Sequence, residues 1–311
     1  MNIQQFQYVL AVVDLKNFEA AAERCFVSQS TLSTMIGRFE SEIGIRIFNR
    51  QTKPVSITPE GEQIIEQLRI LSHEVDALKD LIQELKGEMS GFLRVGIIPT
   101  IAPYLLPLFL IEFAERFPEV DISVSEMTTE EIRRALKLRS LDVGILALPI
   151  YDPDLKEVEL YSEPFLLYDC SGKVRKSKVE VQDLDYSKLC LLKEGHCLRT
   201  QVNRLCELSD KFAGKEVNYK FESGSMDSLL RITALRKGIT VLPFLATSAL
   251  PEEEKNKLSE FALPVPVRTV GLITHKFFVK KRLLRGLKEV LLQSTENLLP
   301  KPTKRRVFDP I

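Results

Sequence analysis

An apolar repeat between residues 59 and 86 constrains this chain more than any other feature of its sequence. Apolar side chains follow one another at alternating spacings of four and three residues, at Ile64, Leu68, Leu71, Val75, Leu78, Ile82 and Leu85. This spacing is the a/d pattern of a coiled coil over about three heptads. Thr58 and Pro59 suit the start of a helix, and Gly87 marks its end. We expect residues 59–90 to form a linker and dimerisation helix; the alternative is a helix packed on its own domain.

The segment before this helix, residues 1–58, has the pattern of a winged helix-turn-helix. Two short helical stretches, 18–25 and 29–39, meet at a tight connection, as in a helix-turn-helix. A polar excursion between apolar residues within 47–62 predicts a two-stranded wing. Hydroxyl, amide and basic side chains in these places can bind base edges and phosphates. We expect DNA contacts from Ser28, Gln29, Ser30, Thr31, Ser33, Thr34, Arg38, Arg50 and Lys53.

From residue 92 onward, strand-like and helical stretches alternate. This alternation predicts a parallel sheet with helices on both faces. The expected strands are 93–98, 120–124, 143–148, 164–168, 189–192, 217–221, 239–242 and 269–274, and the expected helices are 103–117, 130–138, 197–212, 226–236 and 280–298. We expect two α/β lobes with a cleft between them, lobe I from 91–163 and 268–300 and lobe II from 164–267. The basic tail, residues 301–311, is expected to be disordered.

Composition argues against several classes of protein. Lys plus Arg and Asp plus Glu both total 43, so the net charge is zero and any nucleic-acid site must be local. Only three His are present, without a Gly-rich phosphate loop or an HExxH motif, so we expect no metal and no cofactor. The N-terminus lacks a basic signal-peptide region, and no apolar run is long enough to span a bilayer. These features predict a cytoplasmic protein without a membrane partner.

The stretch LCLLKEGHCLRTQVNRLCEL, residues 189–208, contains Cys197 and Cys206. Three interpretations are open: two structural thiols, two ligands of a metal site shared with His196, or a reactive pair. If residues 197–212 are helical, the two Cα atoms lie about 14 Å apart, whereas a disulfide needs about 4.4–6.8 Å. A bond between them would therefore require the helix to unwind. His196 if protonated, Arg199 and the helix start could each lower the pKa of the Cys197 thiol.

The chain resembles a known family over nearly its whole length. AAAERCFVSQSTLSTMIGRFESEIGIRIFNR, residues 20–50, resembles the helix-turn-helix of LysR-type transcriptional regulators, and SITPEGE, residues 56–62, resembles the exit from their wing. The resemblance implies an α/β fold class: an N-terminal all-α winged helix-turn-helix, a long linker helix and a two-lobed periplasmic-binding-protein-like (type 2) effector domain. Ser30 stands in place of a common Pro, and Thr34 in place of a common Arg.

Within that family the chain is similar to the peroxide-sensing OxyR branch. VGIIPTIAPYLLP, residues 95–107, and KEGHCLRTQVNRLC, residues 193–206, carry this closer match. The resemblance implies that Cys197 reacts with peroxide and that Cys206 then forms a disulfide with it. The implied reactive pocket is lined by Thr100, Thr129, His196 and Arg268, with Arg199 as a further local positive charge. Thr200 stands where an Asp is common in this branch.

The resemblance also implies partners and a function. The expected partners are double-stranded DNA, hydrogen peroxide, further copies of the chain in a homodimer or homotetramer, and RNA polymerase. We expect a peroxide-sensing regulator of oxidative-stress genes in bacteria, and not an enzyme. One alternative is a LysR-type regulator that binds a small organic effector in the interlobe cleft, through Thr100, Ser223 and Ser225. Another is a thiol peroxidase, for which a DNA-binding segment would be superfluous.

Overall fold

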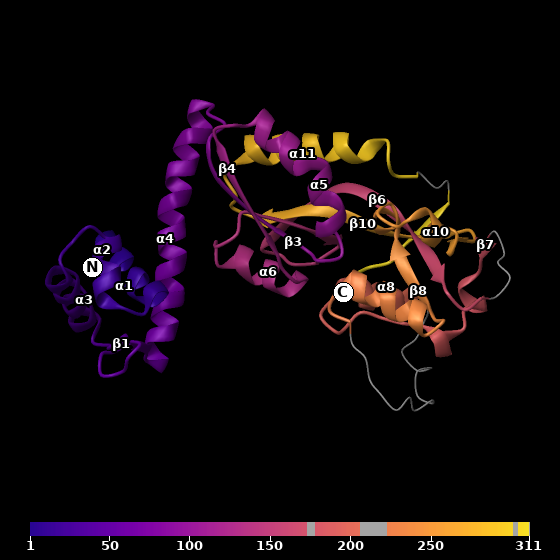
Figure 1. Ribbon diagram of the computed structural model, residues 1–311. Coiled ribbons are helices and arrows are strands. Elements are labelled where there is room, and N and C mark those ends of the chain that lie inside the picture. The colour runs from indigo at the N-terminus through magenta and orange to yellow at the C-terminus, as the bar shows by residue number, and fades with distance from the viewer. Residues whose placement is uncertain (173–177, 206–222, 301–303, 311) are drawn as a thin grey trace. The chain divides into compact units, whose positions relative to one another are not determined.

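The structure, a computed structural model, describes residues 1–172, 178–205, 223–300 and 304–310 (Figure 1). The chain divides into two compact units, one made of Met1–Lys86 with Leu138–Ser140 and the other of the remaining residues. Within the described residues, no helix is both long enough and apolar enough to cross a membrane.

The first unit is a winged helix-turn-helix domain that continues into one long helix. Its helices are α1 (Ile3–Leu15), α2 (Phe18–Arg24), α3 (Gln29–Ile43) and α4 (Pro59–Lys86), and its wing pairs β1 (Phe48–Asn49) with β2 (Ser56–Ile57) in antiparallel fashion. The first three helices begin at Asn2, Asn17 and Ser28, whose side chains accept hydrogen bonds from N–H groups of the first turn. The predicted winged helix-turn-helix is confirmed.

Helix α4 contributes to the core of this domain only over its first part. Leu68 is buried among the apolar residues of α1, α2 and α3. Further along the same seam, Leu71 exposes 47% of its surface and Leu85 exposes 77%. The predicted a/d repeat therefore has two parts: its start stabilises the domain, and its continuation presents apolar side chains to the outside.

The second unit is built on a mixed sheet. The described strands follow the order β4–β3–β5–β10–β6–β9–β7, with β8 paired to β6 and β11 paired to β10. Their bounds are β3 (Gly91–Ile97), β4 (Val120–Glu126), β5 (Val143–Leu148), β6 (Leu155–Asp169), β7 (Lys178–Val179), β8 (Ile239–Pro243), β9 (Leu258–Phe261), β10 (Val265–His275) and β11 (Arg305–Val307). Strand β3 is parallel to β4 and β5, but β10 is antiparallel to β5 and β6. The expected all-parallel sheet is therefore wrong.

Two hydrophobic cores divide this unit into the two expected lobes. Its helices are α5 (Ala102–Arg116), α6 (Thr129–Lys137), α7 (Cys197–Leu205), α8 (Met226–Leu235), α9 (Phe244–Thr247), α10 (Glu252–Lys255) and α11 (Lys281–Glu296), with short turns η1 (Val181–Asp183) and η2 (Tyr186–Lys188). The lobe I core joins β3 and β5 to α5 and α11, and the lobe II core joins β8 to α7 and α8. In Figure 1, α5 and α11 lie on one side of the lobe I strands and α6 on the other. Strand β6 contributes residues to both cores.

Three segments differ from the expected elements or lie outside the residues that the structure describes. Residues 189–192 make isolated bridges, from Leu189 to Ile239 and from Leu192 to Ser223, in place of a strand. The expected strand 217–221 and the second half of the expected helix 197–212 lie outside the described residues. The tail, expected to be disordered, forms β11 alongside β10 because Phe308 is buried in the lobe II core.

Candidate functional site

A buried ion pair lies where β6 and β10 run side by side. Arg268 and Glu163 are paired in the strand register and are both 0% exposed. The Arg268 Nε donates to Glu163 Oε1 at 2.8 Å, and Glu163 Oε2 accepts from the Leu245 backbone N–H at 2.7 Å. A buried guanidinium requires such a partner, because an unpaired buried charge is strongly destabilising.

The same guanidinium reaches Thr100, just after β3. Arg268 donates to the Thr100 hydroxyl oxygen at 3.3 Å and to the Thr100 carbonyl at 3.2 Å. Thr100 is itself buried. The structure therefore brings together two of the residues predicted for the reactive pocket, from segments far apart in the sequence.

Cys197 is the first residue of α7 and lies between the two lobes. It is 6% exposed and packs in the core of lobe I. Leu198, Val202 and Leu205, further along the helix, pack in the core of lobe II. The single side chain at the start of α7 therefore connects a lobe II helix to the lobe I core.

The environment of the Cys197 sulfur acts on its pKa in both directions. Burial raises the pKa of the thiol above its usual value, against the opposing effects of the Arg268 guanidinium, the Thr129 and Thr100 hydroxyls and the Leu198 backbone N–H. The resting thiol is therefore mainly protonated at neutral pH. Of the three local features expected to lower this pKa, only the helix start does so, through the Leu198 N–H. The expected net lowering is wrong, because desolvation outweighs the favourable groups.

His196 and Arg199, which flank Cys197 closely in sequence, do not supply the expected charge. Burial, and then nearby Lys193, lower the pKa of His196, so its imidazole is neutral at neutral pH. The Arg199 guanidinium donates to the Leu192 carbonyl at 3.0 Å and lies 3.7 Å from a Glu194 carboxylate oxygen. The positive charge that acts on the thiol belongs to Arg268 instead.

Thr129, the first residue of α6, has a buried hydroxyl whose interaction is with the thiol. The residue is 9% exposed, and apart from the Cys197 sulfur, whose pKa the hydroxyl lowers, its Oγ1 atom has no hydrogen-bond partner among the residues that the structure describes. Buried hydroxyls without a nitrogen or oxygen partner are uncommon, and each calls for an explanation such as a catalytic role. The surroundings of the Cys197 sulfur thus include a guanidinium and a hydroxyl that is not engaged elsewhere in the described part of the chain.

Reasoning from the sequence missed Glu163. The available signal was an acidic residue directly before the apolar stretch PFLLY, residues 164–168, in a predicted strand. Its significance depends on the register that places it opposite Arg268, and this register is a non-local property.

The structure also bears on the disulfide, metal and organic-effector interpretations. Cys206 lies outside the described residues, so its pairing with Cys197 stays a prediction. Within the described part of the chain, no group of three or more His, Cys, Asp or Glu could hold a metal ion. Of the residues named for an organic effector, Thr100 is already bonded to Arg268, and the Ser223 hydroxyl donates to the Ser225 carbonyl at 2.7 Å. These contacts give that alternative no support.

The predicted DNA-contacting residues of α3 form an exposed polar surface. Gln29, Ser30, Thr31, Thr34 and Arg38 are exposed. Ser28 serves mainly as the cap of the helix, since its hydroxyl accepts from the Thr31 N–H at 3.2 Å. A helix with exposed hydroxyl, amide and guanidinium groups can enter the major groove and bind base edges.

The two predicted basic residues of the wing differ in their surroundings. Arg50 donates to the Ser33 hydroxyl at 2.8 Å and to Glu40 at 3.2 Å, and its guanidinium lies 5.0 Å from the centre of the Phe18 ring. These contacts hold the wing against α3 and α2, and they also engage Ser33. Lys53 is exposed at the tip of the wing.

Comparison with known sequences identifies the class of protein that this fold and these surfaces define. Residues 3–62 match the family described as bacterial regulatory helix-turn-helix protein, lysR family, and residues 86–296 match the LysR substrate binding domain. The chain therefore belongs to the LysR family of bacterial DNA-binding transcriptional regulators.

Within that family the similarity is to OxyR. The DNA-binding transcriptional dual regulator OxyR of Escherichia coli is 34% identical over 277 residues, which cover 88% of this chain and 89% of that protein. The structure of a full-length OxyR variant from Pseudomonas aeruginosa matches with a TM-score of 0.74 and 30% identity, over 96% of this chain and 99% of that one. A hydrogen-peroxide-bound cysteine mutant of Corynebacterium glutamicum OxyR matches with a TM-score of 0.62 and 25% identity, over 95% and 93% of the two chains.

Proposed function

We propose that this chain is a DNA-binding transcriptional regulator that senses hydrogen peroxide through Cys197. The observation that carries the proposal is the setting of Cys197: a buried sulfur acted on by the Arg268 guanidinium and by the Thr129 hydroxyl, which has no other partner among the described residues. The similarity to OxyR proteins, one of them bound to hydrogen peroxide, supports the same conclusion.

The proposed first step is oxidation of Cys197 to a sulfenic acid. The sulfur attacks one oxygen of hydrogen peroxide, the O–O bond breaks, and the second oxygen takes the thiol proton and leaves as water. Because the resting thiol is protonated, this proton is available to the leaving group. Arg268 and the Thr129 hydroxyl can stabilise the negative charge that develops on that oxygen.

The proposed second step is condensation with the Cys206 thiol. The sulfenic oxygen leaves as water with the Cys206 proton, and a disulfide joins the two sulfur atoms. Since Cys197 is buried in the core of lobe I, a second thiol can reach its sulfur only if the start of α7 leaves this core or if the core opens. The oxidised and reduced chains would then differ in the arrangement of α7.

The regulator is proposed to act on DNA in the bacterial cytoplasm as a homodimer or homotetramer. The exposed polar face of α3 and Lys53 would bind the operator, and the exposed part of the α4 seam would bind a second copy of the chain. A change at α7 would alter contacts between subunits, and hence the spacing of the DNA-binding domains and the recruitment of RNA polymerase to oxidative-stress genes.

Peptide mapping of the full chain after brief exposure to peroxide tests this function. The expected product is a Cys197–Cys206 crosslink, absent from Cys197→Ser and unchanged in Cys190→Ser, a matched control at another buried thiol. An unmodified Cys197, together with a Cys197→Ser variant that still changes its operator footprint with peroxide, would overturn the proposal. Sustained turnover of peroxide with a thiol reductant would instead favour a thiol peroxidase.

A further inference from the structure

The described end of the chain, residues 304–310, is bound to the regulatory unit over its whole length, and we call it the strap. Strand β11 within it runs parallel to β10, with Val265 opposite Arg305 and Val267 opposite Val307. The pairing is extended at both ends, where Val265 N–H donates to the Lys304 carbonyl and Phe308 N–H donates to the Val267 carbonyl, each at 3.0 Å.

The strap also contacts α7, the helix that begins at Cys197. Phe308 is buried in the lobe II core together with Leu205. Gln201 donates from Nε2 to the Phe308 carbonyl at 2.8 Å, and Arg204 lies within 4.0 Å of the Asp309 carboxylate. Residues 201, 204 and 205 share one face of a helix, so a single face of α7 is held by the strap.

Gln201 makes α7 dependent on this contact. Its side chain is 0% exposed, and its Oε1 atom has no hydrogen-bond partner among the described residues. The bond from Nε2 to the Phe308 carbonyl is thus the compensation that the structure provides for burying this amide. If the strap leaves, the Gln201 amide loses this bond and α7 loses one of the contacts that hold it in its docked position.

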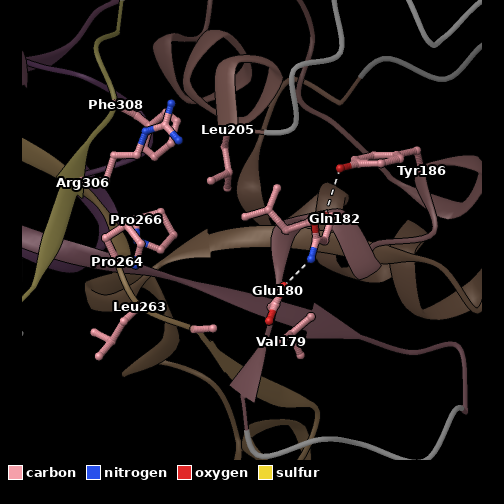
Figure 2. A pocket seen from close by; sticks show the side chains of 12 residues that line it. Val179, Glu180, Gln182, Tyr186, Leu205, Leu263, Pro264, Pro266, Arg306 and Phe308 are labelled. Carbon is pink, nitrogen blue, oxygen red and sulfur yellow. Dashed lines mark hydrogen bonds between the residues drawn. The ribbon is translucent and has the colours of Figure 1, made fainter.

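The strap borders an open pocket at the surface of the regulatory unit. The pocket has a volume of about 460 Å³ and is lined by Phe308, Arg306 and Leu205 on one side and by Glu180 and Gln182 on another (Figure 2). On this side, therefore, the strap and the end of α7 are not covered by the neighbouring lining residues. The contacts that hold α7 to the strap are the few named above.

We propose that the strap is a latch that holds α7, and with it Cys197, in the reduced arrangement. Release of the strap lets the start of α7 leave the core of lobe I. This role rests on the proposed peroxide function. The latch would set how much peroxide is needed before the Cys197–Cys206 disulfide accumulates.

Hydrogen exchange of the reduced full-length protein tests the latch directly. Three proteins would be compared with the native chain: a truncation that ends at residue 303, the point variant Phe308→Ala, and the matched control Val307→Ala, whose side chain is exposed in the same strand. Exchange in residues 197–205 is expected to be at least tenfold faster in the first two and unchanged in the control. Alkylation of Cys197 by iodoacetamide should accelerate in parallel, and half-maximal disulfide formation should occur at a several-fold lower dose of peroxide.

The outcomes separate the latch from the peroxide function. Equal protection of residues 197–205 in the native and truncated chains, both with native circular dichroism, would overturn the latch. The variant Arg204→Ala removes an exposed contact with the strap and leaves the lobe II core intact. It should also accelerate exchange in residues 197–205, and it keeps the test valid if the truncation and Phe308→Ala fail to fold. If α7 loosens in these variants while peroxide leaves Cys197 unmodified in every protein, the latch stands and the peroxide function fails.

Discussion

At the scale of single residues, the sulfur of Cys197 combines low resting reactivity with a site suited to one oxidant. Burial keeps the thiol protonated, while Arg268 and the two threonine hydroxyls favour its charged form. Electrophiles, peroxide included, react with the thiolate, so those that gain nothing from the donors around the sulfur should react slowly. Peroxide can use the donors around the sulfur, so selectivity arises from how the leaving oxygen is bound and not from a low pKa.

The raised thiol pKa predicts a specific pH profile. The rate of Cys197 alkylation by iodoacetamide should rise about tenfold per pH unit from pH 7 to beyond ~8.5, the usual thiol pKa. Because the folded pKa is raised, the associated stability is fully present below ~8.5 and is lost as the pH rises through the folded pKa. Urea unfolding from pH 7 to 10 should show this loss in the native chain and less of it in Cys197→Ser. A rate that levels off below pH 7 would contradict the burial argument.

The Thr129 hydroxyl is expected to affect the rate of Cys197 oxidation and not the stability of the fold. Thr129→Val keeps the shape of the side chain and removes a hydroxyl whose one interaction among the described residues is with the Cys197 sulfur. Because the resting thiol is protonated and a thiol is a weak acceptor, the free energy of unfolding should change by less than about 1 kcal/mol. Oxidation of Cys197 by peroxide should slow by roughly 10²-fold if the hydroxyl stabilises the leaving oxygen. Stopped-flow kinetics and urea unfolding measure the two quantities.

A buried threonine elsewhere supplies the control for this comparison. The Thr295 hydroxyl donates to the Leu291 carbonyl at 2.8 Å within α11. Thr295→Val should leave the rate of peroxide oxidation unchanged. If both variants oxidise at the native rate, the Thr129 hydroxyl has no part in the reaction.

Nearness in sequence was a poor guide to nearness in space at this site. His196 and Arg199 flank the thiol in sequence, but the charge that acts on it comes from Arg268, on strand β10. Glu163 could not have been selected without the register of β6 on β10, which depends on contacts across about a hundred residues of chain. Only the family resemblance, and no local pattern, placed Thr100, Thr129 and Arg268 in one pocket.

At the scale of elements, α4 combines two roles along one apolar seam. Its first part completes the core of the DNA-binding domain, and its exposed continuation includes Leu71, Leu78, Ile82 and Leu85. An exposed apolar stripe on a long helix is typical of a surface that binds another helix. The sequence predicted the helix correctly, because its repeat is local, but not the point at which packing within the domain ends.

This division predicts that the exposed part of the seam can be disrupted without unfolding the domain. Leu71→Lys should weaken self-association and operator binding at least tenfold, because a charge would face the apolar partner, while the melting temperature of the winged helix-turn-helix stays nearly native. Analytical ultracentrifugation and DNA titration measure these effects. Gln67→Lys, an exposed change on the same helix off the seam, is the control. A Leu71→Lys dimer with native DNA affinity would count against the seam.

The strap is an ordered element that its own sequence did not predict. A short basic segment with two prolines has the composition of a disordered tail, and this expectation was wrong for residues 304–310. The burial of Phe308 and the edge of β10 supply the stabilisation, and neither is visible in the segment's own sequence. The antiparallel direction of β10 was missed for a similar reason, since strand direction follows from long-range connections.

At the scale of the whole regulatory unit, the Glu163–Arg268 pair links segments that are distant in the chain. Arg268 bonds Thr100 after β3, and Glu163 bonds Leu245 in α9. Glu163→Gln should lower the free energy of unfolding by about 3–5 kcal/mol, because it leaves a buried guanidinium without its counter-charge. Glu159→Gln, at an exposed position of the same strand, should stay close to native. Urea denaturation compares the two, and equal stabilities would show that the pair is not required.

The position of Cys197 in the core of one lobe, at the start of a helix that belongs to the other, has a consequence for the size of its side chain. Addition of a single oxygen atom to this sulfur enlarges a side chain that is 6% exposed and packs among the apolar residues of lobe I. Overfilling a packed interior typically destabilises it by about 1–3 kcal/mol, and the new oxygen is also polar. The first oxidation event would therefore loosen the junction of the lobes by volume alone, before any second sulfur takes part.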